Sequence, residues 1–441
     1  TGVTLTDDVV LTTAGGNLNI NGAVNGNTSN TQSLTLNATS AGTVSVTSTA
    51  GQTTSLKTLT LTNSNSATFA ESVKADTSVV LSNTTAGQTI AFQDNLTTPT
   101  LTTTANGYNL ALLGSNTNIN DIQVATVFIN TGTLTLGNQA TDSLTFVGGL
   151  TATAPSNINA AGQINTSGLN VINLGDSVVG SATGVTLTDD VTLTTAGGNL
   201  NINGAVNGTI ANTQSLTLNA TSAGTVSVTS TVGQTTSLKT LTLTNSNGAT
   251  FTSSVKADTS VVLSNTLAGQ TIIFQDNLTT PTLTTTSNGY NLALQGSNTN
   301  ISDTQAATVF NNTGILTLGN NATDNLTFAG GLTAIAPSSI NAAGQISTSG
   351  AGVINLGDAT AGSATDLTLT DDVVLSTSGG ALNINGAVNG TTANTQSLTL
   401  NATSAGTVSV TSTLGQTTSL KTLTLTNSNG ATFASAVKAD T

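Results

Sequence analysis

A tandem repeat 182 residues long constrains the fold of this chain more than any other feature. Residues 1–182 recur as residues 183–364, and the first part of the unit returns a third time as residues 365–441. Tandem copies of this kind are typical of scaffolds that grow in one dimension. Such growth escapes the limit of roughly 250 to 300 residues at which a single globular core stops growing. We therefore expect residues 1–441 to form one continuous solenoid.

A shorter theme recurs inside each copy, as VTL, SLTLN, TLTLTNS and related segments. In the first copy, and at the start of the second, it begins at Val3, Ser33, Thr58, Ser78, Pro99, Thr133, Val171 and Val185. The mean spacing is roughly 23 residues, which is the length of one rung of a parallel β-helix rather than of a helical repeat. The spacing predicts eight rungs per copy and roughly 19 to 20 rungs in the chain.

The theme alternates apolar and polar residues, as Leu59 and Leu61 do between threonines. Alternation with period two is typical of a strand with one buried face. Gly, Asn, Ser and Asp separate these segments, and signals for helices are nearly absent. The sequence therefore predicts an all-β fold, a single elongated parallel β-helix.

Differences between the copies indicate which positions face outward. Leu113, Ile122 and Ile129 of the first copy are replaced by Gln295, Thr304 and Asn311 in the second. Exchange of an apolar for a polar residue is tolerated outside a core, so these positions are predicted to lie in loops or on the surface.

A polar residue follows the theme two positions after its last apolar residue in most rungs. Asn and Asp tolerate positive φ and bond neighbouring backbone, so they suit sharp corners. Stacked rung on rung, they are predicted to form a structural corner ladder. The ladder comprises Asp7, Asn63, Asn83, Asn138, Asp176, Asn245, Asn265, Asn320 and Asn427.

Composition excludes several classes of function. The net charge is −13, and there is no Arg, His or Cys. Nucleic-acid binding depends on Lys and Arg neutralising phosphates, so it is not expected. A Ser or Thr nucleophile would lack its usual base, so the chain is not expected to be an enzyme. The sequence contains no run of 18 apolar residues, so it does not predict insertion into a membrane.

Calcium is the one cofactor for which the sequence offers ligands. Asp7, Asp176, Asp189, Asp358 and Asp371 are the candidates, because carboxylates on neighbouring rungs could converge on the ion. The GGxGxD repeat of calcium β-rolls is missing, and alternation sends adjacent aspartates to opposite sides. A solvated turn without cofactor is the expectation, with calcium as its alternative.

Outward threonines suggest an alternative function. Thr4, Thr35, Thr60, Thr102 and Thr135 are predicted to align as a column, which Val80 interrupts. A flat Thr and Asn face could act as a binding module for ice or glycan. Thr is also a favourable strand residue wherever it faces water, which leaves a purely structural reading open.

The rungs SLTLNATSAGTVSV and TLTLTNSNSATFAESV make the whole chain resemble the β-strand-repeat regions of large bacterial surface exoproteins, the filamentous-haemagglutinin-like family. That resemblance implies a right-handed parallel β-helix at the cell surface or outside the cell. It implies a stalk that holds an adhesive tip, or the material of a fibre or sheath. We expect a section of a longer array, with any contact between copies of the protein made laterally.

Overall fold

The computed structural model describes residues 2–178, 182–360 and 364–441. Contacts divide the chain into two compact units, Thr1–Ser230 and Thr231–Thr441. The described residues contain strands and turns and no helix.

The strands of unit 1 are short, and most have three or four residues. They are β1 (Val3–Leu5), β2 (Val9–Thr12), β3 (Leu18–Ile20), β4 (Val24–Gly26), β5 (Leu34–Asn37), β6 (Val44–Val46), β7 (Leu56–Asn63), β8 (Ala67–Phe69), β9 (Val73–Leu81), β10 (Thr89–Phe92), β11 (Leu96–Thr98), β12 (Thr100–Thr102), β13 (Asn109–Leu112), β14 (Asn116–Ile119), β15 (Thr126–Val127), β16 (Leu134–Leu136), β17 (Ser143–Phe146), β18 (Leu150–Ala152), β19 (Asn157–Thr166), β20 (Ile172–Leu174), β21 (Gly184–Thr194), β22 (Leu200–Ile202), β23 (Val206–Gly208), β24 (Leu216–Asn219) and β25 (Val226–Val228).

The strands of unit 2 have similar lengths. They are β26 (Leu238–Asn245), β27 (Ala249–Phe251), β28 (Val255–Leu263), β29 (Thr271–Phe274), β30 (Leu278–Thr280), β31 (Thr282–Thr285), β32 (Asn291–Leu294), β33 (Asn298–Ile301), β34 (Thr308–Val309), β35 (Ile315–Leu318), β36 (Asn325–Phe328), β37 (Gly331–Ala334), β38 (Ser339–Ser347), β39 (Val353–Leu356), β40 (Asp366–Ser376), β41 (Leu382–Ile384), β42 (Val388–Gly390), β43 (Leu398–Asn401), β44 (Val408–Val410), β45 (Leu423–Asn427) and β46 (Ala431–Phe433).

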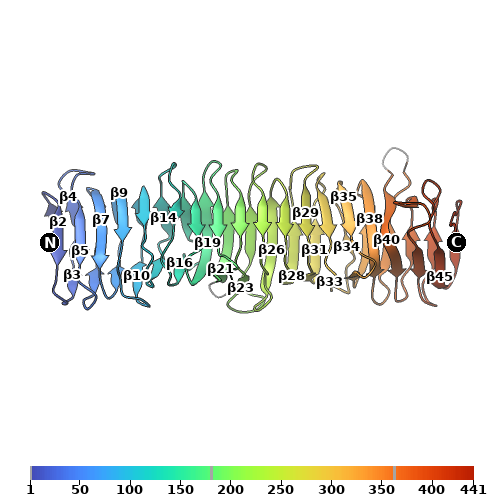
Figure 1. Cartoon of the computed structure of the whole chain (residues 1–441), viewed down its shortest axis with the longest axis horizontal. Coiled ribbons are helices and arrows are strands. Elements are labelled where there is room, and N and C mark those ends of the chain that lie inside the picture. Colours follow the sequence, from blue (N-terminus) through green and yellow to red (C-terminus); the bar gives the residue numbers. More distant parts are fainter. Residues whose placement is uncertain (1, 179–181, 361–363) are drawn as a thin grey trace. The chain divides into compact units, whose positions relative to one another are not determined.

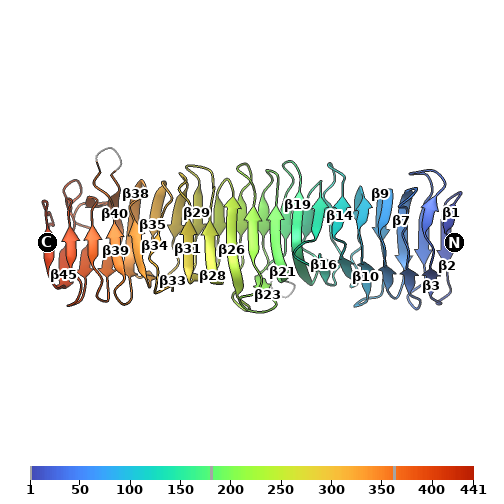
Figure 2. The same cartoon turned by 180° about the vertical axis from the view of Figure 1, so that it is seen from behind.

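Each unit is a parallel β-solenoid with three faces, and successive turns of the ribbon lie side by side within it (Figure 1). In unit 1, face A begins with β1 and β4, face B with β2 and β5, and face C with β3 and β6. The view from behind shows the same stacking (Figure 2). The chain makes about 18 turns of about 24 residues, so the predicted all-β parallel β-helix is confirmed, with slightly longer and fewer rungs than expected.

Alternation along the strands builds the core as the sequence predicts. Leu34, Leu59 and Val79 lie opposite one another in the ladder β5–β7–β9, and each is at most 1 % exposed. Their strand neighbours point outward and are only partly buried. Full burial of such a side chain contributes roughly 1.5 to 3 kcal/mol, and the ladder repeats this gain at every turn.

Phenylalanines stack along the core as well. The rings of Phe69 and Phe92, on β8 and β10, are parallel with centroids 4.7 Å apart. The rings of Phe128 and Phe146 meet edge to face at 5.9 Å. Both arrangements add roughly 0.5 to 1.5 kcal/mol to the burial of the rings.

The sequence repeat does not match a whole number of turns. Along face C, eight steps of the ladder lead from β3 through β6, β8, β10, β13, β16, β19 and β21 to β23. The copy of β3 is β22, which pairs with β20 on face B and precedes β23 by one face. One copy therefore spans 7⅔ turns, and the expected eight rungs per copy is wrong by one face. The difference arises because one turn takes about 24 residues, slightly more than the expected rung, so the 182 residues of a copy fall short of eight turns.

Unit 2 follows the same rule. β27 belongs to the face that continues through β29 and β32. Its copy β46 belongs to another face, which runs through β39, β41 and β44. Identical sequence thus occupies different faces of the solenoid within each unit.

Candidate functional surface

The predicted corner ladder is not one column. Asn63 lies opposite Asn37 in the ladder of β5 and β7, and the bridge between Ser64 and Thr84 places Asn83 on the same corner. Asn138 instead follows β16 on face C. The ladder residues are therefore spread over several corners, because one theme does not correspond to one face.

At some of these corners the asparagine itself has a positive φ, and at others the glycine before it does. Asn83 and Asn265 adopt the predicted left-handed conformation, with φ of 53° and 52°. At Asn138, Asp176 and Asn320 the preceding glycine has the positive φ instead: 73° at Gly137, 72° at Gly175 and 74° at Gly319. Asn63, Asn245 and Asn427 are the last residues of β7, β26 and β45, and Asp7 accepts a hydrogen bond from the Asp8 amide.

A hydrogen-bonded asparagine ladder does exist, in the middle of strands rather than at corners. Asn201 Nδ2 donates to Asn173 Oδ1 at 2.6 Å, and Asn173 Nδ2 donates to Thr151 Oγ1 at 3.3 Å. The row joins three successive turns on face B. In unit 2, Asn383 and Asn355 form the same 2.6 Å bond. The sequence could not locate this row, because it depends on the register of strands about 24 residues apart.

The calcium candidates all accept hydrogen bonds from nearby backbone. Asp189 accepts from the amide of Ala140 at 2.9 Å, and Asp371 accepts from Ala322 at 3.0 Å. Asp176 accepts from Val178 at 2.9 Å, within its own loop. In the described parts of the chain no three carboxylates lie close enough together to hold a metal ion.

Asp358 accepts two hydrogen bonds from Thr360 in its own loop. The hydroxyl of Thr360 donates to its Oδ1 at 2.7 Å, and the Thr360 amide donates to the same atom at 3.0 Å. These bonds lower the pKa of the Asp358 carboxyl, the hydroxyl bond being the larger cause. The side chain is thus an ionised cap of an exposed turn.

The predicted threonine column is shorter than expected. Thr35, Thr60, Val80 and Thr102 do lie in register on face B. Thr4 pairs with Asn25 on face A, and Thr135 pairs with Ala111 and Asn159 on face C. The outward row from β5 to β12 on face B therefore holds threonine at Thr35, Thr60 and Thr102 only, and Val80 interrupts it.

A cleft in the sheet is the most distinctive surface feature, and the sequence did not predict it. β12 pairs with β9 and β15 pairs with β18, but no ladder joins β12 to β15. A cavity of about 330 Å³ lies between them. One end is closed by the bond from the Asp121 amide to the Pro99 carbonyl (3.1 Å), and the other by the bond from the Ile129 amide to Thr103 Oγ1 (2.9 Å).

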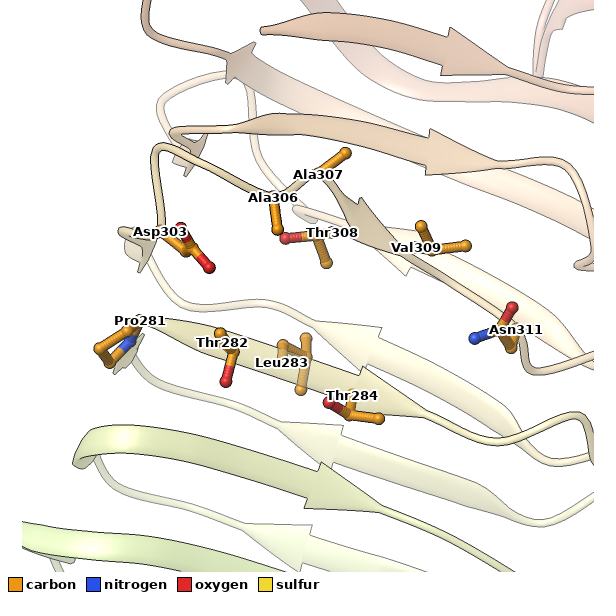
Figure 3. A pocket seen from close by; sticks show the side chains of 10 residues that line it. All are labelled: Pro281, Thr282, Leu283, Thr284, Asp303, Ala306, Ala307, Thr308, Val309 and Asn311. Atoms are coloured by element: carbon orange, nitrogen blue, oxygen red, sulfur yellow. The ribbon is translucent and has the colours of Figure 1, made fainter.

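The second copy has the same cleft between β31 and β34, with a cavity of about 230 Å³. Figure 3 shows Asp303 and Asn311 at opposite ends of the gap. The first cleft is lined by Ile129, which is 40 % exposed, whereas its copy in the second cleft is Asn311. Ile122, in the loop between β14 and β15, is 63 % exposed, and its copy is Thr304. The outward assignment of these positions is confirmed. The outward Thr102 also lines the cleft, but neither signal predicts that a strand ladder is missing there.

Comparison with protein-family models, with curated proteins and with solved structures finds no match to this chain. Within residues 2–178, 182–360 and 364–441, no helix has the length and apolar character needed to cross a membrane.

Proposed function

We propose that this chain is a structural β-solenoid whose function is extension: the stalk of a surface adhesin, or the material of an extracellular fibre or sheath. The coarse part of this proposal rests on the parallel solenoid fold. The cell-surface location and the likeness to filamentous-haemagglutinin-like exoproteins are proposals that rest on the resemblance of the repeats.

One observation carries the proposal. A copy spans 7⅔ turns, so equivalent segments such as β3 and β22 occupy different faces. A binding function requires its residues on a fixed face, whereas a spacer requires only that each turn stack on the last. The same observation weighs against a Thr and Asn face for ice or glycan, because the threonine rows change face from copy to copy.

The proposed role needs neither catalytic residues nor a cofactor. The aspartates that could bind calcium have a structural use, since they accept backbone hydrogen bonds. We propose that any contact between copies of the protein is lateral, along the polar rows of the faces. The net charge of −13 argues against nucleic acid as a partner.

The test is the length of a variant that carries a second copy of residues 183–364 inserted after residue 364. At about 4.8 Å per turn, 7⅔ extra turns should lengthen the particle by about 37 Å in negative-stain electron microscopy. An inserted copy that folds but leaves the length unchanged would contradict extension as the function. Specific retention of the unmodified chain on an ice or glycan surface would favour the binding module instead.

A further inference from the structure

We propose that each cleft is a binding site for a row of water molecules, which join β12 to β15 in the first copy and β31 to β34 in the second. The two clefts occupy equivalent positions of the sequence repeat, with cavities of about 330 and 230 Å³. Each row takes the place of the ladder that is missing between two successive turns of the described chain.

The alternation of a parallel ladder determines which backbone groups face the cleft. Thr126 points into the core and donates its amide to Gly149 of the next turn at 2.9 Å. The backbone groups of its outward neighbours, Ala125 and Val127, therefore point back toward β12. By the same rule the inward Leu101 directs its amide and its carbonyl forward, toward β15.

These facing groups are not bonded to one another. A closed ladder would pair the Leu101 amide with the Ala125 carbonyl, but the described residues form no such bond and no ladder. The same holds for Leu283 and Ala307 in the second copy. Leu101 and Leu283 are only 5 % and 4 % exposed, and backbone groups at such positions are almost always bonded, to water where protein is out of reach.

A proline stands at the entrance of each cleft and interrupts the ladder. The Pro99 carbonyl accepts a hydrogen bond from the Asp121 amide of the next turn at 3.1 Å, and the Pro281 carbonyl accepts from Asp303 at 3.0 Å. The nitrogen of the same proline also faces the next turn, but it has no hydrogen to donate. The ladder therefore lacks a donor at the same place in both copies.

A threonine hydroxyl at the other end shows how far apart the strands lie. The Ile129 amide donates to Thr103 Oγ1 at 2.9 Å, and Thr103 Oγ1 donates to the Val127 carbonyl at 3.5 Å. In the second copy Thr285 Oγ1 bridges the equivalent backbone groups at 2.7 and 3.4 Å. One oxygen that accepts and donates thus lies between the strands, in place of a direct backbone bond.

Water has the same hydrogen-bonding capacity as this hydroxyl, and it continues the row where the chain supplies no hydroxyl. Figure 3 shows Leu283 and Val309 on the two facing strands of the second cleft. A water between such strands accepts from an amide and donates to a carbonyl, and a bridge of this kind is nearly as favourable as a direct bond. A water molecule takes about 30 Å³ in the liquid, so each cavity has room for several.

An inserted peptide strand does not fit the same gap. A strand needs about 4.8 Å on each side to pair with both neighbours. The bonds at Pro99 and Thr103 hold the two ends of the first cleft at the distance of a direct bond and of a single bridging oxygen. The geometry therefore favours water over a segment of another chain.

The first test is a crystal structure of the full chain at a resolution that shows ordered water. Water should lie within hydrogen-bond distance of both the Leu101 carbonyl and the Val127 amide, and at the equivalent place between Leu283 and Val309. A direct ladder in either cleft would overturn the proposal, and so would side chains that fill the gap and exclude water.

A pair of variants tests the same site in solution. Leu101 lies two residues before Thr103 on the same side of the strand, so Leu101→Thr should place a hydroxyl between the Val127 amide and the Ala125 carbonyl, where it displaces a water. The Val127 amide should then exchange with solvent about tenfold more slowly than in Leu101→Val, which has the same shape without the hydroxyl. Both variants lose a similar buried volume, and the Thr126 amide serves as the internal reference. Equal exchange at Val127 in the two variants would contradict a site for a bridging oxygen.

The converse variant removes the natural hydroxyl and keeps Leu101 in the core. In Thr103→Val the Ile129 amide loses its partner to water, so it should exchange about tenfold faster than in the unmodified chain, while Thr126 keeps its rate. An unchanged rate at Ile129 would mean that no bridging oxygen is needed between these strands, and it would overturn the proposal even if the Leu101 variants do not fold.

Discussion

Thr39, Thr221 and Thr403 occupy the same corner in the three copies, and each has a positive φ: 57°, 55° and 57°. A β-branched residue in the left-handed region is strained by roughly 1 to 2 kcal/mol. The Thr39 amide donates to Asn37 Oδ1 at 3.1 Å, which helps to hold the turn in this conformation. The corner thus keeps a residue that is less suitable than Asn or Gly.

Replacing Thr39 by Asn should therefore stabilise the chain, by about 1 kcal/mol. The expected result is a higher denaturant midpoint for Thr39→Asn. Thr35→Asn serves as the control, because Thr35 lies in β5, where Asn is a poorer strand residue and should lower the midpoint. A lower midpoint for Thr39→Asn would show that the hydroxyl contributes more than the strain costs.

Tyr108 and Tyr290 make stability depend on pH. Each side chain is fully buried, and its hydroxyl donates to the carbonyl of Leu81 or Leu263 at 3.3 or 3.2 Å. Desolvation by burial raises the pKa of both tyrosines above the usual value of 10.0. Below pH 10 both the folded and the unfolded chain hold the proton, so the full stability is present. Above it the unfolded chain ionises first, and stability falls.

The chain should accordingly lose stability as the pH rises above about 10, before the buried tyrosines themselves ionise. The measurement is the urea midpoint across the alkaline range. The double variant Tyr108→Phe, Tyr290→Phe should have a lower midpoint at neutral pH, because each hydroxyl donates one hydrogen bond and accepts another from the Thr104 or Thr286 amide, and a weaker fall above pH 10. An equally steep fall in the double variant would assign the effect to other groups.

At the scale of the strand, much of the fold could be predicted from sequence. Leu59, Leu61 and Phe69 lie in the core, as alternation indicates. The face on which a strand lies could not be predicted, because it depends on the summed lengths of all preceding turns. The Asn173–Asn201 bond and the cleft at β12 both depend on pairing between turns, which local pattern does not specify.

The cleft leads to a prediction about hydrogen exchange. Thr126 and Phe128 donate their amides to Gly149 and Thr151 of the next turn, both at 2.9 Å. The amide of Val127 points the opposite way, toward β12, since amides alternate along a strand, and no ladder joins the two strands. The Val127 amide should exchange much faster than those of Thr126 and Phe128.

Nuclear magnetic resonance or mass spectrometry with fragmentation can resolve these three amides. Val309 and Phe310 supply an independent pair, since the Phe310 amide donates to Thr333 at 2.9 Å and Val309 borders the second cleft. Similar protection at Val127 and Thr126 would mean that β12 and β15 pair in solution.

For the whole molecule, the offset of one face per copy makes the faces interchangeable. β3 and β22 have the same sequence, and each packs on a different face of unit 1. A core that accepts the same strand on different faces depends on alternation and volume more than on one unique set of neighbours. Stability is then close to a sum over turns and their contacts with the turns on either side.

Removal of one full copy should therefore be tolerated even though it moves every later strand to another face. Deleting residues 61–242 joins Thr60 to Leu243 and restores the sequence of β7 across the junction. The variant should unfold with an unchanged midpoint and with a smaller m value, in proportion to the surface that it buries. The matched control deletes residues 61–241 and so retains Thr242 as one extra residue in the strand. Because a slip of one residue sends inward side chains outward, this control should unfold at lower denaturant. If both deletions are equally stable, alternation within the strand does not specify the stack; if both are destabilised, the faces are not interchangeable.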